Sequence, residues 1–243
     1  METRNFQRVL VWELPVRIFH WVNALTILTL TLSGFLIANP PALLSNAEAI
    51  NLHSFGIVRY IHFTAGYLFF FNMILRVYWS FVGNQFASWR ALWPFDKKRW
   101  GNFKHVIKND ILLMNDKKPE LKNISIGHNS VAAFSYLILF IIALISVFTG
   151  FALYADSSAW WFPKLFSWVT PMFGGDFMVR NIHHIAMWGF ILFVIIHLYL
   201  VFFHDWLEGR GEVSSMFGGY KFVREERIKK VKEEEEEKKS NKN

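Results

Sequence analysis

The sequence has 243 residues, of which 53% are hydrophobic and none is cysteine, and its formal net charge is +7. The apolar residues fall into long blocks, which excludes an ordinary soluble domain and indicates a protein that crosses a membrane several times. Without cysteine the chain cannot attach a c-type haem, bind an iron–sulfur cluster through thiolates or form a disulfide. Any redox metal must therefore be held by histidine.

Four apolar blocks are long enough to cross a membrane as helices. In chain order they cover residues 18–38, 57–82, 131–154 and 182–203. Asn39, Pro40 and Pro41 end the first block, because proline cannot continue the hydrogen-bond ladder of a helix. The first block begins with arginine and histidine rather than a signal-peptide pattern, so no cleavable signal is expected. We expect an all-α membrane protein, with a four-helix bundle in residues 1–206 and a charged tail in 207–243.

The basic residues indicate on which side of the membrane each loop lies. Three arginines precede the first block, ten Lys and Arg lie between residues 76 and 122, ten follow the fourth block, and only three lie elsewhere. By the positive-inside rule both termini and the central loop are cytoplasmic, and loops 42–55 and 155–179 face outward. The positive charge is thus a topology signal and predicts no nucleic-acid partner.

Two loops are rich in aromatic residues. The central loop carries Trp89, Trp93 and Trp100 among lysines, which is typical of short interfacial helices. The second outer loop has two open interpretations, an aromatic belt on the outer membrane surface or a docking surface for a partner subunit. Its aromatic residues are Trp160, Trp161, Phe162, Phe166 and Trp168.

His183 and His197 lie fourteen residues apart in the fourth block. At about 100° per residue this spacing is roughly 40° short of four turns, so both imidazoles share one helix face. Their axial separation is ~21 Å, which fits within a hydrocarbon layer of ~30 Å and leaves one histidine in each leaflet. Ionisable side chains inside a membrane are costly, so each is a candidate functional residue.

Two further histidines match these by depth. His62 lies near the outer start of the second block and His20 near the cytoplasmic start of the first. Ligation of haem iron by two histidines needs two neutral imidazoles that face each other from different helices at one depth. The pattern therefore predicts His62 with His183 in the outer leaflet and His20 with His197 in the inner leaflet. A single buried histidine can equally be a hydrogen-bonded packing residue.

Three arginines strengthen this hypothesis. Arg17, Arg59 and Arg180 each precede one of the four histidines by three residues, a spacing that places both side chains on one helix face. Each arginine lies nearer the membrane edge, where haem propionates need a cationic partner. The alternative is that these arginines only anchor the ends of the spans.

His128 and Asn129 open the third block at the cytoplasmic side, level with the inner histidine pair. A carbonyl ligand such as a quinone needs hydrogen-bond donors beside an apolar slot, so these two residues are a candidate quinone site. A helix cap explains Asn129 equally well. The remaining histidines are weaker candidates, and His184 points about 100° away from His183 along the helix.

The chain resembles a known family, the b-type cytochrome subunit of membrane-bound nickel–iron hydrogenases, which is related to the diheme gamma subunits of formate dehydrogenases. The resemblance covers residues 8–206 and is carried mainly by the P-x-R-x-x-H-W opening and by R-x-Y-W-x-F-x-G-N after the second block. The matching segments are VWELPVRIFHWVNALTILTLTLSGFLIANP (11–40), VRYIHFTAGY (58–67), RVYWSFVGNQFASW (76–89), GHNSVA (127–132), RNIHH (180–184) and IHLY (196–199).

This resemblance implies a fold and a function. Four transmembrane helices hold two b haems through histidines that match His20, His62, His183 and His197. The large and small hydrogenase subunits oxidise hydrogen at the outer face of the bacterial inner membrane, and iron–sulfur centres pass the electrons to the outer haem. The inner haem passes them to a quinone near the cytoplasmic face. The subunit itself does not activate hydrogen.

Other functions stay open at this point. The equivalent subunit of a formate dehydrogenase or a thiosulfate reductase would have the same two haems and a different electron donor. A cofactor-free anchor or transporter is a further alternative. A di-iron membrane enzyme such as a desaturase fits poorly, because such enzymes cluster histidines in short cytoplasmic motifs that this chain lacks.

Overall fold

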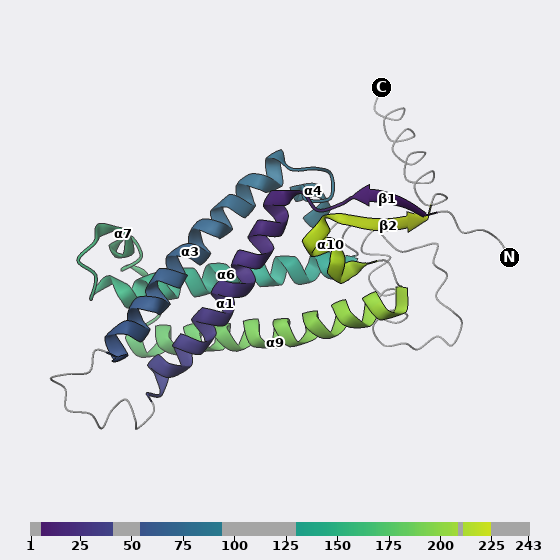
Figure 1. Cartoon of the computed structure of the whole chain (residues 1–243). Coiled ribbons are helices and arrows are strands. Elements are labelled where there is room, and N and C mark those ends of the chain that lie inside the picture. Colours follow the sequence, from purple (N-terminus) through teal and green to yellow (C-terminus); the bar gives the residue numbers. More distant parts are fainter. Residues whose placement is uncertain (1–5, 41–53, 94–129, 209–210, 225–243) are drawn as a thin grey trace. The chain divides into compact units, whose positions relative to one another are not determined.

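The computed structural model describes residues 6–40, 54–93, 130–208 and 211–224 (Figure 1). His128, Asn129 and most of the charged tail lie outside these residues. Four long helices dominate the described chain, with short helices and two strands around them. In chain order the elements are β1 (Phe6–Leu10), α1 (Leu14–Ala38), α3 (Ser54–Val82), α4 (Trp89–Leu92), α6 (Ser130–Ala155), α7 (Trp161–Lys164), α8 (Val169–Met172), α9 (Asp176–Glu208), α10 (Glu212–Gly218) and β2 (Tyr220–Arg224).

The four predicted membrane spans are confirmed as helices. Each of α1, α3, α6 and α9 is long and apolar enough to cross a membrane. The fourth begins at Asp176, six residues before the predicted start, because it follows Gly174 and Gly175, whose φ angles are 82° and 116°. An aspartate in the first turn is favourable at the positive end of the helix dipole. The first turns of α9 therefore come from residues that the sequence analysis gave to the outer loop.

The described residues belong to two compact units, each of which is described by itself. The helical unit, which carries most of the four long helices, consists of Ile18–Trp79 and Tyr136–Ile196. The terminal unit consists of Met1–Arg17, Ser80–Ser135 and His197–Asn243, so far as these are described.

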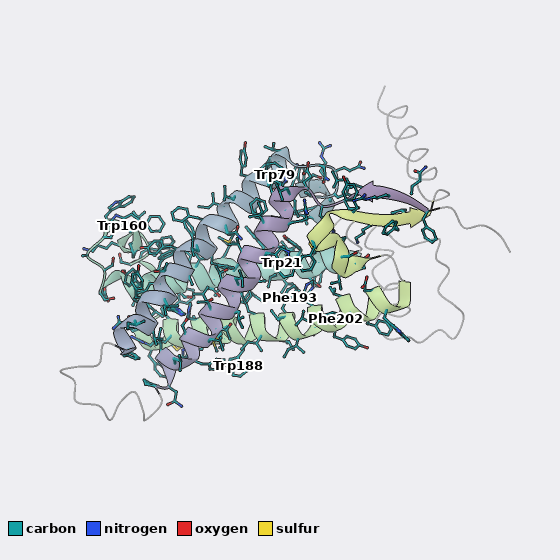
Figure 2. All side chains as sticks on the ribbon, viewed as in Figure 1. Trp21, Trp79, Trp160, Trp188, Phe193 and Phe202 are labelled. Carbon is teal, nitrogen blue, oxygen red and sulfur yellow. The ribbon has the colours of Figure 1, made fainter. Side chains whose placement is uncertain are left out.

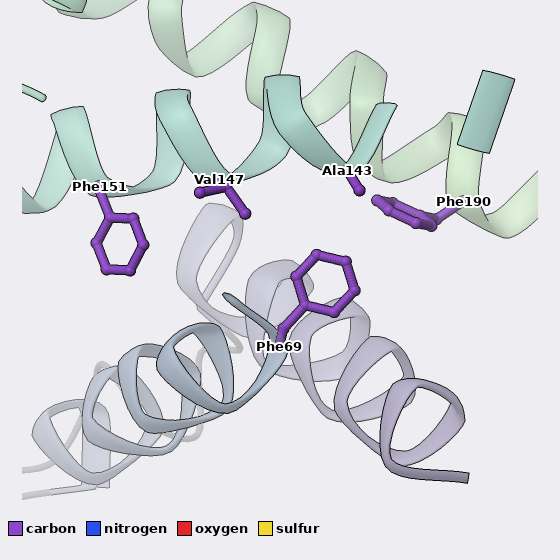
Figure 3. Packing of buried hydrophobic residues seen from close by; sticks show 5 residues of the cluster. All are labelled: Phe69, Ala143, Val147, Phe151 and Phe190. Carbon is purple, nitrogen blue, oxygen red and sulfur yellow. The ribbon is translucent and has the colours of Figure 1, made fainter. Parts of the chain in front are cut away.

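The core of the helical unit is built from α3, α6 and α9. Figure 3 shows Phe69 of α3 directed toward the row of Ala143, Val147 and Phe151 on α6. Phe190 of α9 completes the cluster, with its ring centre 5.9 Å from that of Phe69 in an edge-to-face arrangement. Aromatic pairs in this geometry are worth about 0.5–1.5 kcal/mol beyond the area that they bury.

The aromatic loop after α6 divides into two groups. Phe162 and Phe166 pack against the core cluster, where Phe151 and Phe166 stack with ring centres 5.2 Å apart. The tryptophans instead stay exposed, and Trp160 lies beside α7 in Figure 2. In the described part of this loop the phenylalanines thus pack into the bundle, whereas Trp160 and Trp168 stay about half exposed beside Tyr67 and Phe148.

The outer surface of the long helices is apolar. Trp188, labelled in Figure 2, is 57% exposed, and Leu25, Leu28 and Leu32 lie exposed along α1. Contiguous apolar surface of this extent is unfavourable in water and matches the hydrocarbon of a bilayer.

In the terminal unit the two strands pair in an antiparallel sheet. The register runs from Phe6 opposite Arg224 to Leu10 opposite Tyr220. Gly219 follows α10 with φ 84°, and its carbonyl accepts hydrogen bonds from the backbone N–H groups of Val11 and Trp12 at 2.9 and 3.0 Å. The sequence analysis predicted neither strand, since each is only five residues long and they are separated by most of the chain.

Candidate functional site

The structure brings together two of the predicted histidines, both in the helical unit. His62 of α3 and His183 of α9 face each other with ring centres 6.4 Å apart and ring planes at 68°. Both lie about two turns from the N-terminal end of their helices, which places them at similar depth. They come from different helices and both are half-buried.

This separation fits a shared metal ion. Two imidazoles that bind one metal from opposite faces, each through a metal–nitrogen bond of about 2 Å, have ring centres roughly 6 Å apart. The 6.4 Å between His62 and His183 is close to that value. Nitrogen donors of this kind also suit haem iron, which His62 and His183 would hold between them. The residues present therefore fit the expected haem.

Each imidazole is held by a hydroxyl from a neighbouring helix. The Nδ1 atom of His62 lies 2.9 Å from Oγ of Ser33 on α1. The Nδ1 atom of His183 lies 2.9 Å from Oγ1 of Thr149 on α6. All four long helices thus contribute to this pair, two with the imidazoles and two with their hydrogen-bond partners.

Ser33 and Thr149 were not predicted as site residues, because single Ser and Thr residues in apolar helices usually bond to their own backbone. A signal is nevertheless present in the sequence. Ser33 and Thr149 are each followed by glycine and phenylalanine, in the segments Ser33–Gly34–Phe35 and Thr149–Gly150–Phe151. The same three-residue pattern therefore occurs near the C-terminal end of two different spans.

The two histidines of the predicted inner pair belong to different units. His20 lies on α1 in the helical unit, half-buried, with its ring edge-to-face to Trp21 at 5.1 Å. His197 lies on α9 in the terminal unit and is also half-buried. Their pairing stays a prediction.

The three arginines are found in unlike surroundings. The Nη1 atom of Arg17 donates a hydrogen bond to the backbone carbonyl of Phe217. Arg59 and Arg180 are exposed, and the guanidinium of Arg59 lies 5.6 Å from the ring centre of Phe63. An exposed guanidinium keeps its donors available for an acidic group, so the propionate role stays a prediction for these residues.

A buried polar group lies deeper in the helical unit, where sequence reasoning missed it. The Nδ2 atom of Asn72 donates to the backbone carbonyl of Phe19 at 3.0 Å and to Oδ1 of Asn23 at 2.7 Å, which links α3 to α1. Arg76 is 7% exposed and its Nε donates to the hydroxyl of Tyr136 at 3.0 Å. We had counted Arg76 only as a topology charge, although it lies well inside the second predicted span.

Some candidates remain separate from the site. His184 is exposed, and its offset of about 100° turns it away from the facing pair. Across residues 6–40, 54–93, 130–208 and 211–224, histidine and acidic side chains form no group of three or more that could hold a metal ion. The described metal-binding geometry is therefore that of a facing pair.

Comparisons with known proteins identify the family of the chain. Residues 11–219 match the model of the family described as prokaryotic cytochrome b561. The chain is 34% identical over 230 residues to a protein of Azotobacter vinelandii and 36% identical over 224 residues to one of Rhizobium leguminosarum bv. viciae. The first alignment covers 93% of both chains, and the second covers 90% of this chain and 91% of its relative.

Both relatives carry the name "Probable Ni/Fe-hydrogenase B-type cytochrome subunit". A relative in Escherichia coli K12, named as such a subunit of hydrogenase 1, is 33% identical over 216 residues, which cover 87% of this chain and 89% of that protein. The match extends over nearly the whole described bundle, including all four long helices and the facing histidines. The chain therefore belongs to the prokaryotic cytochrome b561 family, among the Ni/Fe-hydrogenase B-type cytochrome subunits, and is a membrane electron-transfer cytochrome that uses haem b.

Proposed function

We propose that this chain anchors a nickel–iron hydrogenase to the bacterial inner membrane and conducts its electrons to the quinone pool through two b haems. The observation that carries the proposal is the facing pair His62 and His183, whose ring separation of 6.4 Å suits iron ligation from both sides. The names of the relatives support a hydrogenase rather than a formate dehydrogenase or thiosulfate reductase as the electron donor.

The chain's own residues divide the task between two sites. His62 and His183 hold the outer haem iron, and His20 and His197 hold the inner one. When bound, each haem supplies a one-electron couple between ferric and ferrous iron. Phe69, Phe151 and Phe190 make the interior of the helical unit apolar, which limits the access of water and of protons to the couple.

Both ends of the bundle have proposed partners. At the outer end the iron–sulfur small subunit docks and brings the large subunit with it, while Arg59 and Arg180 bind the propionates of the outer haem. At the cytoplasmic end Arg17 binds the propionates of the inner haem. His128 and Asn129 donate hydrogen bonds to the quinone carbonyls. Both termini are cytoplasmic in this arrangement. The haem-bearing part is 1–206, and 207–243 form the cytoplasmic segment, of which Tyr220–Arg224 pair with the N-terminal strand.

The test uses the hydrogenase complex purified from membranes with the full chain in place. We expect two haems per chain and b-type bands in the reduced-minus-oxidised spectrum. Each of His62→Ala, His183→Ala, His20→Ala and His197→Ala loses about half of the haem and stops hydrogen-dependent quinone reduction. Hydrogen oxidation with an artificial dye persists, because it does not use this chain.

His184→Ala is the matched control, since this exposed imidazole is the direct neighbour of His183. It is expected to keep both haems and full quinone reduction. Full haem content in His62→Ala or His197→Ala would show that the ligand assignment is wrong. A purified complex with molybdenum or tungsten in place of nickel would instead refute the choice of electron donor.

A further inference from the structure

Two hydroxyls approach the facing histidines from helices that carry no part of that pair. Ser33 Oγ lies 2.9 Å from Nδ1 of His62, and Thr149 Oγ1 lies 2.9 Å from Nδ1 of His183. The distances are equal and both contacts reach the same ring atom. Because the same contact occurs in both helix pairs, we expect the two hydroxyls to have the same role.

The direction of each hydrogen bond follows from the other contact of the hydroxyl. Ser33 Oγ donates its proton to the backbone carbonyl of Thr29 at 2.5 Å, and Thr149 Oγ1 donates to that of Ile145 at 2.6 Å. A hydroxyl has one proton and two lone pairs, so once the proton is engaged it can only accept from the imidazole. In this arrangement Nδ1 carries the ring proton in both histidines.

This bond fixes the tautomer of each ring. A neutral imidazole has one N–H and one lone pair, so protonation at Nδ1 leaves the lone pair on Nε2. Nε2 is the atom farther from the ring's own backbone and is free to bind a metal. The two hydroxyls thereby prepare both rings for ligation and also limit their rotation.

The residue that follows each hydroxyl completes the support. A Cβ atom on Gly150 would lie 3.1 Å from Cε1 of His183, and one on Gly34 would lie 3.5 Å from Cε1 of His62. At Gly150 the absence of a side chain lets the helix backbone approach the edge of the imidazole, whereas the contact at Gly34 is an ordinary one. The hydroxyl and the glycine together contact the imidazole from one side and limit its movement.

We propose that Ser33 and Thr149 are positioning residues that fix the tautomer and orientation of His62 and His183 and thereby set the redox potential of the outer haem. This inference rests on the proposed ligand roles of the two histidines. A hydrogen bond accepted from Nδ1–H makes the imidazole a stronger donor to the metal and favours the ferric state. Removing the acceptor favours the ferrous state, so the midpoint potential rises.

The test compares Ser33→Ala and Thr149→Val with the parent in the purified complex. Valine keeps the shape of threonine and removes the hydroxyl. We expect each variant to keep both haems and to raise the midpoint potential of one of them, with an increase of up to about tenfold in the ferrous-to-ferric ratio, equivalent to 59 mV for one electron. The other haem keeps its potential. The paramagnetic resonance signal of the ferric outer haem shifts as well, since ring orientation affects it.

Thr26→Val is the matched control. Thr26 is 6% exposed on α1 and its hydroxyl also bonds to the carbonyl four residues back, Val22, at 2.8 Å. Its removal should leave both potentials unchanged. If Ser33→Ala loses the haem and Ser33→Thr restores it, the inference is also supported.

Unchanged potentials in both hydroxyl variants would overturn the inference, as would an equal shift in Thr26→Val. The ligand variants distinguish this failure from a failure of the proposed function. If His62→Ala and His183→Ala lose a haem but the hydroxyl variants behave as the parent does, only the positioning role is refuted. If the histidine variants keep all haem, the ligand assignment has failed first.

Discussion

Gly150→Ala tests whether the close approach of α6 to His183 is needed for haem binding. The added Cβ would lie 3.1 Å from Cε1 of His183, which is tighter than an ordinary van der Waals contact. The imidazole has little freedom to move away, because Thr149 on the same helix holds its Nδ1 at 2.9 Å. We therefore expect the methyl group to displace the ring rather than be accommodated.

Three other helical glycines provide a graded comparison. At Gly189 a Cβ would also lie 3.1 Å from its nearest neighbour, but that neighbour is Cδ1 of Ile142, the mobile end of an aliphatic chain. At Gly34 the nearest atom, in His62, is 3.5 Å away, an ordinary contact. At Gly66 nothing lies within 4 Å.

The magnitudes follow from two opposing effects. Alanine is about 1 kcal/mol more favourable than glycine inside a helix. An extra methyl in a packed interior costs about 1–3 kcal/mol when its neighbours cannot move. We expect Gly66→Ala to stabilise the protein by about 0.5–1 kcal/mol. Gly189→Ala should be nearly neutral, and Gly150→Ala should destabilise by up to about 2 kcal/mol.

The assay is haem content per chain together with thermal unfolding in detergent. Gly150→Ala should lose a large share of one haem and unfold at a lower temperature, whereas Gly34→Ala keeps its haem. The reasoning is refuted if Gly150→Ala retains both haems at parent stability. It is refuted equally if Gly189→Ala, with the same contact distance, loses as much haem as Gly150→Ala.

Two further changes probe the supports around this site. Asn72→Leu removes the hydrogen bonds to Phe19 and Asn23. Thermal unfolding should show that the protein loses about 1 kcal/mol of stability, which is typical of polar contacts between membrane helices. An unchanged stability would contradict the link between α1 and α3. Gly219→Ala places a Cβ 2.6 Å from the carbonyl of Trp12 at a φ of 84°, so limited proteolysis should cleave the terminal segments faster than in the parent. Gly218→Ala is the control, since nothing lies within 4 Å of its added Cβ, and equal cleavage rates in the two variants would contradict this reasoning.

The spans and the approach of His62 to His183 could be predicted from the sequence for simple physical reasons. A bilayer needs long apolar helices, and such helices are visible as uninterrupted blocks. Topology then orders residues by depth, which was enough to match His62 with His183. Depth does not reveal which side chains on the other two helices approach those rings. Ser33 and Thr149 therefore became apparent only when the helices were placed around the pair.

The features that could not be predicted depend on contacts between distant segments. β1 and β2 are too short to give a pattern, and each forms only because the other is present. Arg76 was counted as a topology charge because composition cannot show that Tyr136, sixty residues later, supplies a hydrogen-bond partner for it. Whether a charged residue can enter a span depends on such a partner, which is set by helix packing.

The pairing of β1 with β2 has a consequence for how the chain threads a membrane. Backbone hydrogen bonds between Phe6–Leu10 and Tyr220–Arg224 can form only when both segments occupy the same compartment. The chain between the two strands must then cross the membrane an even number of times. Four spans meet this condition, whereas three or five would not. Reporter domains fused to the N-terminus and to the C-terminus should therefore be found on the same side of the membrane. The sheet also cannot close until the last span has been inserted, so it forms as a late step that joins the two ends of a completed bundle.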